Sequence, residues 1–167
     1  TSTPTAAVWG GEPADDLLSW LGVGRRHLVG DDGPTAEVGT LEGLVLLDLP
    51  DFDSREEANR VEAERVLELV DLFVWVTDPQ KYADARLHDD YVTALATHEA
   101  VTMVVLNQSD RLGEAEVAQC REDLVRLMAR DGMPRAAVLA TSARSGAGLD
   151  ELRQRLANAV AGRTMSR

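Results

Sequence analysis

The chain has 167 residues, of which 44% are hydrophobic, and its net charge is −12; this is enough for one domain with a proper core. So acidic a chain lacks the clustered Lys and Arg that general DNA or RNA binding needs, and an anionic membrane surface would repel it. With a single cysteine, Cys120, it can form no internal disulfide, which fits a reducing compartment. We expect a cytoplasmic location, with peripheral membrane association left open. The chain has no apolar run near the ~18 residues of a membrane span.

The first third of the chain predicts short strands and one short helix. The predicted elements are strands over residues 6–9 and 26–29 and a helix over residues 13–21. A third strand is predicted over residues 41–47, and its apolar run, residues 44–47, ends on Asp48. Because residues 44–47 do not alternate with polar residues, we expect a strand that is buried on both faces.

The remainder of the chain alternates helical patterns with apolar runs. Helices are predicted over residues 54–70, 83–99, 114–130 and 149–160, and strands over residues 72–76, 101–106 and 136–139. Such alternation is typical of helical crossovers between parallel strands. We therefore expect an α/β fold, a three-layer sandwich with a mainly parallel sheet.

Polar residues follow three of the predicted strands. Asp48 ends the first, Asn107-Gln108-Ser109-Asp110 follows residues 101–106, and Thr141-Ser142-Ala143-Arg144 follows residues 136–139. In open α/β sheets, ligands bind beyond the carboxyl ends of the strands. An Asp at that rim is the usual holder of a Mg²⁺ water beside a nucleotide phosphate.

The carboxylate of Asp110 suits guanine better than adenine. A carboxylate can accept two N–H groups side by side, and guanine offers such a pair in its N1–H and 2-amino groups. Adenine offers no such pair at those positions. The small Ala143 after Ser142 would let a backbone N–H reach the guanine carbonyl.

These motifs resemble those of the P-loop GTPases, in the Era-like and dynamin-like branches. That family's third, fourth and fifth motifs are Asp-x-Pro-Gly, Asn-Lys-x-Asp and Ser-Ala-Lys. In the same order, the chain has Asp48-Leu49-Pro50-Asp51, Asn107-Gln108-Ser109-Asp110 and Ser142-Ala143-Arg144. The resemblance covers residues 1–163, which we interpret as a fragment of a GTP-binding domain, followed by a tail over residues 164–167. The segment over residues 75–82 looks particular to one bacterial subgroup of these proteins.

The resemblance implies a switch protein that binds GTP and GDP with Mg²⁺ and hydrolyses GTP slowly. The residues implied in binding the base are Asn107, Gln108, Asp110, Ser142, Ala143 and Arg144. Asp48 would orient the Mg²⁺ shell, together with a switch I threonine, Thr1 or Thr3. Asp48 and Asp51 are the candidate catalytic residues. Because no His or Gln stands near Asp51, strong intrinsic hydrolysis is not expected.

The chain departs from the family pattern at three points. It contains no Gly-x-x-x-x-Gly-Lys-Ser/Thr loop, which supplies the phosphate-binding amides, the lysine and a Mg²⁺ ligand. We expect that loop upstream of Thr1 or on another chain; otherwise the two strands that flank its strand pair directly. Asp51 replaces the glycine that meets the γ-phosphate, and Gln108 replaces a lysine that packs along the base.

Two interpretations of the function, each from a different functional class, stay open. The chain can be a nucleotide-free protein-binding module with a degenerate GTPase fold, or an α/β phosphoryl-transfer enzyme whose acidic rim includes Asp78 and Lys81. Asn107 and Asp110 alone also fit an ordinary Asx-turn before a helix. The partner protein is unknown, and a dimer is left open.

Overall fold

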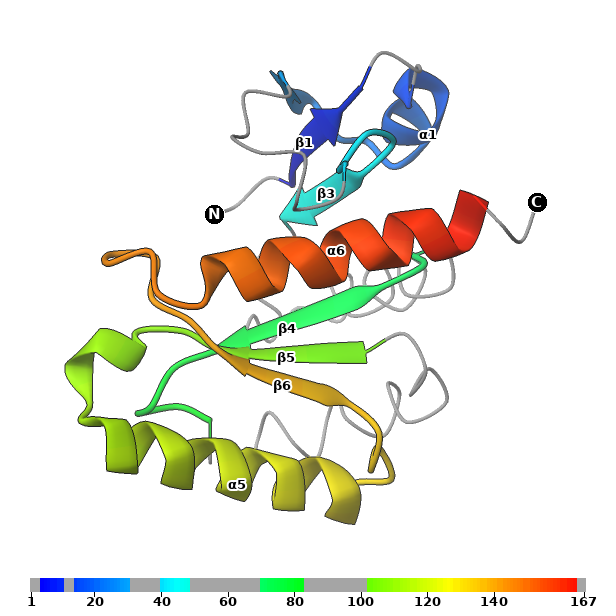
Figure 1. The fold of residues 1–167 in the computed structure, drawn as a ribbon. Helices are drawn as coiled ribbons and strands as arrows, with labels where there is room; N and C mark the ends of the chain where they lie inside the picture. The colour runs from blue at the N-terminus through cyan, green and yellow to red at the C-terminus, as the bar shows by residue number, and fades with distance from the viewer. Residues whose placement is uncertain (1–3, 11–13, 31–39, 49–69, 83–101, 165–167) are drawn as a thin grey trace. The chain divides into compact units, whose positions relative to one another are not determined.

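The computed structural model describes residues 4–10, 14–30, 40–48, 70–82 and 102–164, with side chains to residue 162 (Figure 1). The chain divides into two compact units: Thr1–Leu69 with Arg153–Arg167, and Val70–Leu152. We call these the first and the second unit. The helices predicted over residues 54–70 and 83–99 fall almost wholly outside the described residues.

The first unit contains a mixed three-stranded sheet. Its elements are β1 (Thr5–Trp9), α1 (Asp15–Trp20), β2 (Arg25–Val29) and β3 (Val45–Asp48). The strand order is β2–β1–β3, with β1 parallel to β2 and antiparallel to β3. The predicted strands over residues 6–9 and 26–29 are therefore present, and β2 adds an outer strand beside β1.

The core of the first unit is small. It is formed by the buried residues Ala6, Val8, Leu18 and Val23, with partly buried side chains of β3 packed against them. Leu18 brings α1 onto the sheet, so the helix is held by one fully buried side chain although it has only six residues. A six-residue helix is too short to be stable alone, so this packing is what maintains it.

The expectation that residues 44–47 form a strand buried on both faces is wrong. β3 begins at Val45, and its residues alternate between partly buried and exposed. Leu46 exposes 40% of its surface. The physical reason is that β3 lies at the edge of the sheet that the described strands form, with one covered face, so its apolar run does not mark a central strand there.

The second unit contains an entirely parallel three-stranded sheet. Its elements are β4 (Phe73–Thr77), β5 (Thr102–Leu106), the 3₁₀ turn η3 (Ser109–Arg111), α5 (Glu114–Arg130), β6 (Ala137–Ala140) and the start of α6 (Leu149–Thr164). The strand order is β4–β5–β6. The α/β fold with a parallel sheet is thus confirmed.

Within the second unit, α5 and the first turn of α6 pack against this sheet (Figure 1). Met103, Val105 and Leu139 form a buried cluster against which Leu152, in the first turn of α6, packs. On the opposite face α5 lies along the sheet, where the Arg121 guanidinium donates to the Val138 carbonyl. All five residues of β5 are buried because the strand is central and covered on both sides. Within the described residues, no helix combines the length and the hydropathy needed to cross a membrane.

The strands β3 and β4 do not pair with each other. β3 pairs only with β1, and β4 pairs only with β5, among the strands that the structure describes. The expectation that the strands on either side of the family's P-loop strand would pair directly is therefore wrong for these residues. Each of the two strands instead keeps one edge without a described partner, which is where an added strand can bind.

Candidate functional site

The site lies where β5 and β6 end. Because the two strands are parallel neighbours, the loops that follow them leave the same edge of the sheet. Backbone hydrogen bonds continue the pairing into the loops: Thr141 N–H donates to the Leu106 carbonyl at 2.9 Å, and Ser109 N–H donates to the Thr141 carbonyl at 3.0 Å. The sequence motifs at residues 107–110 and 141–144 are thereby brought together.

Asp110 and Ser142 form the shortest side-chain contact of this site. The Ser142 hydroxyl donates to Asp110 Oδ1 at 2.6 Å, and it accepts from the Ser145 N–H at 3.1 Å. Ser142 is fully buried, whereas the Asp110 side chain exposes 21% of its surface. Asp110 is therefore held in one orientation while part of its side chain stays exposed.

The same hydrogen bond favours the ionised form of Asp110. The Ser142 hydroxyl lowers the pKa of Asp110 below its ordinary value of 3.8, and Arg144 and Arg111 lower the pKa further. Desolvation opposes them, but it does not reverse the direction. Asp110 is consequently an ionised carboxylate at neutral pH, able to accept hydrogen bonds but not to donate them.

Asn107 joins the two loops through its side chain. Its Oδ1 accepts from the Ala143 N–H at 3.1 Å and from the Thr141 hydroxyl at 3.4 Å. Its amide NH₂ group has no partner among the described residues, so it is a donor available to a ligand. The Ala143 N–H, expected from the sequence to meet a guanine carbonyl, is here bonded to Asn107.

Gln108 has an unusual backbone conformation. Its φ is 62°, and it is the only non-glycine residue with positive φ in the described part of the chain. This left-handed conformation costs a non-glycine residue roughly 1–2 kcal/mol. It lets the chain turn sharply from β5 into η3, so Asp110 can reach Ser142. Strain of this kind is concentrated at functional sites.

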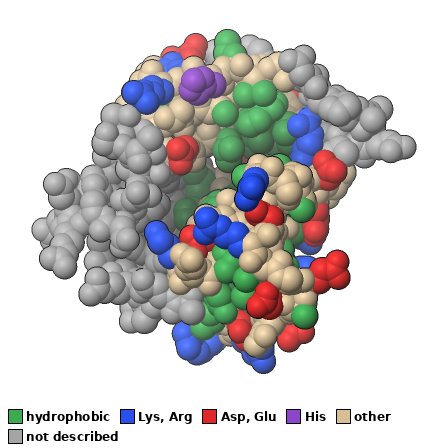
Figure 2. Space-filling model, turned by 90° about the vertical axis from the view of Figure 1, so that its left-hand side faces the viewer, with side chains coloured by type: hydrophobic (Ala, Val, Ile, Leu, Met, Phe, Trp, Pro, Cys, Tyr) green, Lys and Arg blue, Asp and Glu red, His purple; other side chains and the backbone are tan. Residues whose placement is uncertain are grey.

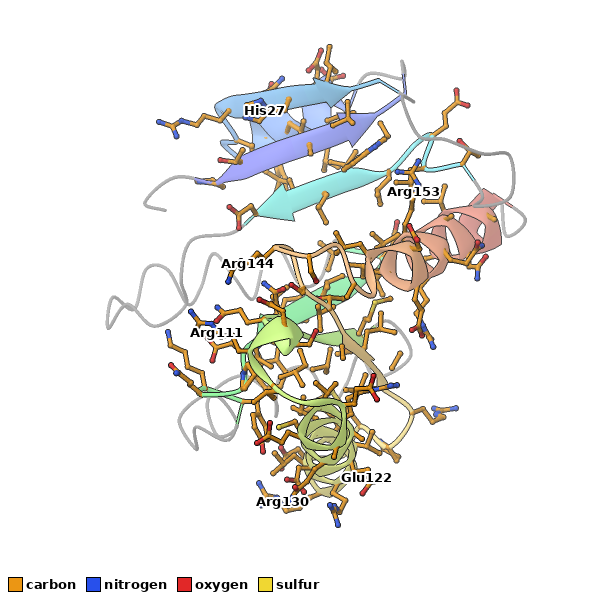
Figure 3. The ribbon with its side chains drawn as sticks, turned by 60° about the vertical axis from the view of Figure 1, so that its left-hand side comes forward. His27, Arg111, Glu122, Arg130, Arg144 and Arg153 are labelled. Atoms are coloured by element: carbon orange, nitrogen blue, oxygen red, sulfur yellow. The ribbon has the colours of Figure 1, made fainter. Side chains whose placement is uncertain are left out.

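Two arginines border the carboxylate. Arg144 Nη1 lies 4.0 Å from Asp110 Oδ2, and the Arg144 side chain is 89% exposed. Arg111 comes from η3, and Figure 3 shows both arginines extending from this end of the second unit. At this distance and exposure the Arg144 pair contributes little to stability, so the guanidinium is available to a ligand.

Two glycines that we did not single out as site residues shape the loop after β6. Gly148 has φ +72°, and a Cβ at this position would collide with the Ala140 carbonyl. Gly146 has φ +84°, but it has open space around it. Close approach and positive φ are the two conditions that demand glycine, and Gly148 meets both. The Gly-x-Gly pattern after Ser142 was the available signal.

Thr77 is a second residue that sequence reasoning missed. It ends β4, and its carbonyl accepts from the Asn107 N–H at 2.8 Å. It is only 7% exposed, and its hydroxyl is buried without a hydrogen-bond partner. An unpaired buried hydroxyl costs about 1–3 kcal/mol. A threonine at the end of a buried strand is a weak sequence signal, because many such hydroxyls bond within their own strand.

The remaining predicted site residues are not part of this cluster. Asp48 ends β3 in the first unit, where it pairs with Thr5 across the β1–β3 register and is exposed. Thr1, Thr3 and Asp51 lie outside the described residues. Their predicted roles stay predictions.

The residues of the phosphoryl-transfer alternative have a local role. Asp78 Oδ1 accepts from the N–H groups of Gln80 and Lys81 at 2.8 and 3.1 Å, which makes it an Asx-turn after β4. In the described part of the chain, no group of three or more His, Cys, Asp or Glu residues could hold a metal ion. These residues give that alternative no support.

Comparison with known proteins gives a likeness of fold. No family model matches the sequence, and no curated protein matches it. Among solved structures, the chain is similar to translation elongation factor SelB from Methanococcus maripaludis in complex with the GTP analogue GppNHp, with a TM-score of 0.57 and 14% identity. The match covers 92% of this chain and 32% of that one, so the chain spans about a third of the length of that protein. The fold of this chain therefore resembles that of a GTP-binding elongation factor.

Proposed function

We propose that this chain is the base-recognition part of a guanine-nucleotide switch, which binds GTP and GDP with Mg²⁺ and hydrolyses GTP slowly. One observation carries the proposal: Asp110 is fixed by Ser142, and Asn107 is fixed by Ala143, at adjoining strand ends. The likeness of fold to a protein solved with a GTP analogue supports the same conclusion.

Asp110 provides the specificity in this proposal. Its Oδ2, and the remaining acceptor capacity of Oδ1, would receive the N1–H and 2-amino groups of guanine. Adenine has an unprotonated N1 and no 2-amino group, so the ionised carboxylate would meet an acceptor and lose both hydrogen bonds. A site built to hydrogen-bond a group rejects ligands that lack it strongly.

Asn107, Gln108 and the residues after Ser142 would hold the rest of the base. The free amide NH₂ of Asn107 would donate to a purine ring nitrogen, and the Ala143 N–H would be shared with the guanine carbonyl. The aliphatic part of Gln108 would pack along the base. The exposed Arg144 would lie over the base or near the ribose, where a guanidinium can stack on an aromatic face.

The metal and the hydrolytic step involve the other predicted residues. Asp48, an exposed carboxylate at a strand end, fits the role of holding Mg²⁺ waters, and Thr1 or Thr3 would supply the switch I hydroxyl. The reaction would be attack of water on the γ-phosphate. Asp51, if directed at that phosphate, would repel it, and with no general base near it we propose slow hydrolysis.

The phosphate-binding loop would come from a segment outside these 167 residues. Its strand would pair with a described strand that keeps one edge without a described partner, such as β4. We further propose a cytoplasmic protein, with peripheral membrane association and a dimer left open.

Titration of a fluorescent GDP with Mg²⁺ tests the proposal. It is added to this chain and to a longer protein that includes the residues encoded upstream of Thr1. We expect binding by the longer protein, competed by GTP and not by ATP. Failure of both to bind would contradict the proposal and favour the nucleotide-free protein-binding module.

A further inference from the structure

The outer edge of β2 has no partner among the described strands. β2 pairs with β1 along its whole length, from Thr5–Arg25 to Trp9–Val29. On its other side no strand pairs with it in the part of the chain that the structure describes. An edge strand presents a row of backbone N–H and C=O groups that another extended segment can pair with. The edge is therefore a template for one more strand.

An apolar side chain marks this edge. Leu28 is 83% exposed, more than any other large hydrophobic residue described; Val76 and Trp20 follow at 58% and 55%. Single exposed apolar residues are ordinary on protein surfaces. On an unpaired edge strand, however, such a residue would pack against the side chains of an added strand.

Two exposed basic residues lie beside Leu28 on the same strand. Side chains alternate along a strand, so Arg25 and His27 share the face opposite to that of Leu28. Both are exposed, and neither makes an ion pair among the described residues. Arg26, between them, has its charge paired: it donates to Asp15 at 2.7 Å and to Ser19 at 2.9 Å.

We propose that the edge of β2 binds an extended acidic peptide segment of a partner protein as a fourth strand of the sheet. The segment would carry two acidic residues two positions apart, facing Arg25 and His27, and an apolar residue on the other face against Leu28. Figure 3 shows His27 on the outermost strand of its sheet, and Figure 2 shows a histidine at the surface beside a Lys or Arg side chain.

Charge complementarity favours an acidic peptide at the edge of β2. A net charge of −12 opposes an extended polyanion such as nucleic acid or an anionic lipid surface, whereas a short acidic strand can meet the positive charge of Arg25 and the imidazole of His27 locally. A second copy of this chain, pairing antiparallel through the same edge, would place the basic residues 25–27 against their own counterparts. An acidic strand meets the same surface with opposite charges.

The inference does not depend on nucleotide binding. β2 lies in the first unit, whereas Asn107, Asp110 and Ser142 lie in the second. Peptide binding and nucleotide binding are therefore tested separately, and failure of one leaves the other standing.

The test uses fluorescence anisotropy with this 167-residue chain and two labelled peptides. The acidic peptide is Thr-Val-Glu-Val-Glu-Val-Thr, which alternates acidic and apolar faces and reads the same in both directions. The basic control peptide replaces both Glu with Lys. Protein variants are Arg25→Glu with His27→Glu, and separately Leu28→Ser; the matched controls on α5 are Arg130→Glu and Val125→Ser.

We expect the acidic peptide to bind and the basic peptide not to bind. The double variant and Leu28→Ser should each weaken binding, the double variant by about tenfold or more, with both α5 controls unchanged. Hydrogen exchange at the amides of residues 25–29 should slow on binding, which a side-chain contact alone would not produce. Absence of binding, equal binding of both peptides, or equal binding by the double variant would overturn the proposal.

Discussion

Similar apolar runs form strands of different burial in the two sheets of the molecule. In the second unit, β5 is buried at all five positions and lies between two parallel neighbours. In the first unit, β3 alternates between partly buried and exposed residues and lies at a sheet edge. An uninterrupted apolar run therefore does not by itself identify a central strand. Its neighbours do.

The difference also separates two halves of the proposed function. The residues proposed to recognise the base follow β5 and β6 and are fixed by hydrogen bonds within the second unit. The proposed metal residue Asp48 follows β3 in the first unit. The proposed base site is consequently held by contacts that the structure describes, whereas the proposed phosphate site also involves residues that it does not describe.

The largest expected effect is on core stability. Leu139→Ala removes a fully buried side chain from the β4–β5–β6 sheet and should lower the free energy of unfolding by about 2–5 kcal/mol. Leu46→Ala, in β3, removes a side chain that is 40% exposed and should cost less than half as much. Chemical denaturation of both variants measures this. Equal losses would show that the two sheets are packed alike.

Gly148→Ala should cost about 3 kcal/mol of unfolding free energy, because the new Cβ meets the Ala140 carbonyl and φ is positive. Gly146→Ala is the matched control: φ is positive there too, but the space is open, so we expect only about 1–2 kcal/mol. Urea denaturation compares them. A loss for Gly148→Ala no larger than for Gly146→Ala would contradict the close approach.

Ser142→Ala should have a smaller effect with a distinctive pH dependence. The pKa of Asp110 is lowered in the folded protein, chiefly by Ser142. The stabilisation is therefore present above the ordinary pKa of 3.8 and is lost as the pH falls through the folded pKa. The stability difference between wild type and variant should be full at pH 7 and shrink in acid. A difference that does not change with pH would rule out Asp110 as the partner.

The smallest effect should have the opposite sign. Thr77→Val replaces a buried hydroxyl that has no partner with a methyl group, so it should stabilise the fold by about 1 kcal/mol. Thr102→Val is the control on the neighbouring strand: Thr102 is equally buried but does have an interaction partner, so its loss should destabilise. Thermal unfolding gives both signs. Destabilisation by Thr77→Val would mean that its hydroxyl is satisfied.

Much of the second unit could be predicted from the sequence. The helix predicted over residues 114–130 has those bounds, because its apolar residues recur at helical spacing. Its start is fixed by Glu116, whose carboxylate accepts from the Gly113 N–H at 2.8 Å. The proximity of residues 107–110 to residues 141–144 followed from the parallel order of two strands. Those local and topological signals are strong in a single sequence.

The rest depends on geometry that no residue pattern specifies. The short strand β2 could be predicted, but not its place outside β1, because pairing order is a tertiary property. The hydrogen bond from Ser142 to Asp110 requires the left-handed turn at Gln108, which is rare for glutamine. The sequence also does not show that the Thr77 hydroxyl is unpaired, because this depends on whether neighbouring groups in the folded chain can hydrogen-bond to it.

The most direct test of the account is a change of base specificity at Asp110. Asp110→Asn replaces one carboxylate oxygen with an NH₂ donor, which matches the carbonyl that xanthine carries in place of the guanine 2-amino group. Calorimetric titration would use GDP, XDP and ADP with the protein extended upstream of Thr1. We predict that wild type prefers GDP and that the variant prefers XDP, each by about tenfold or more. Unchanged preference in the variant, or equal binding of ADP by wild type, would contradict the assignment of this site to guanine.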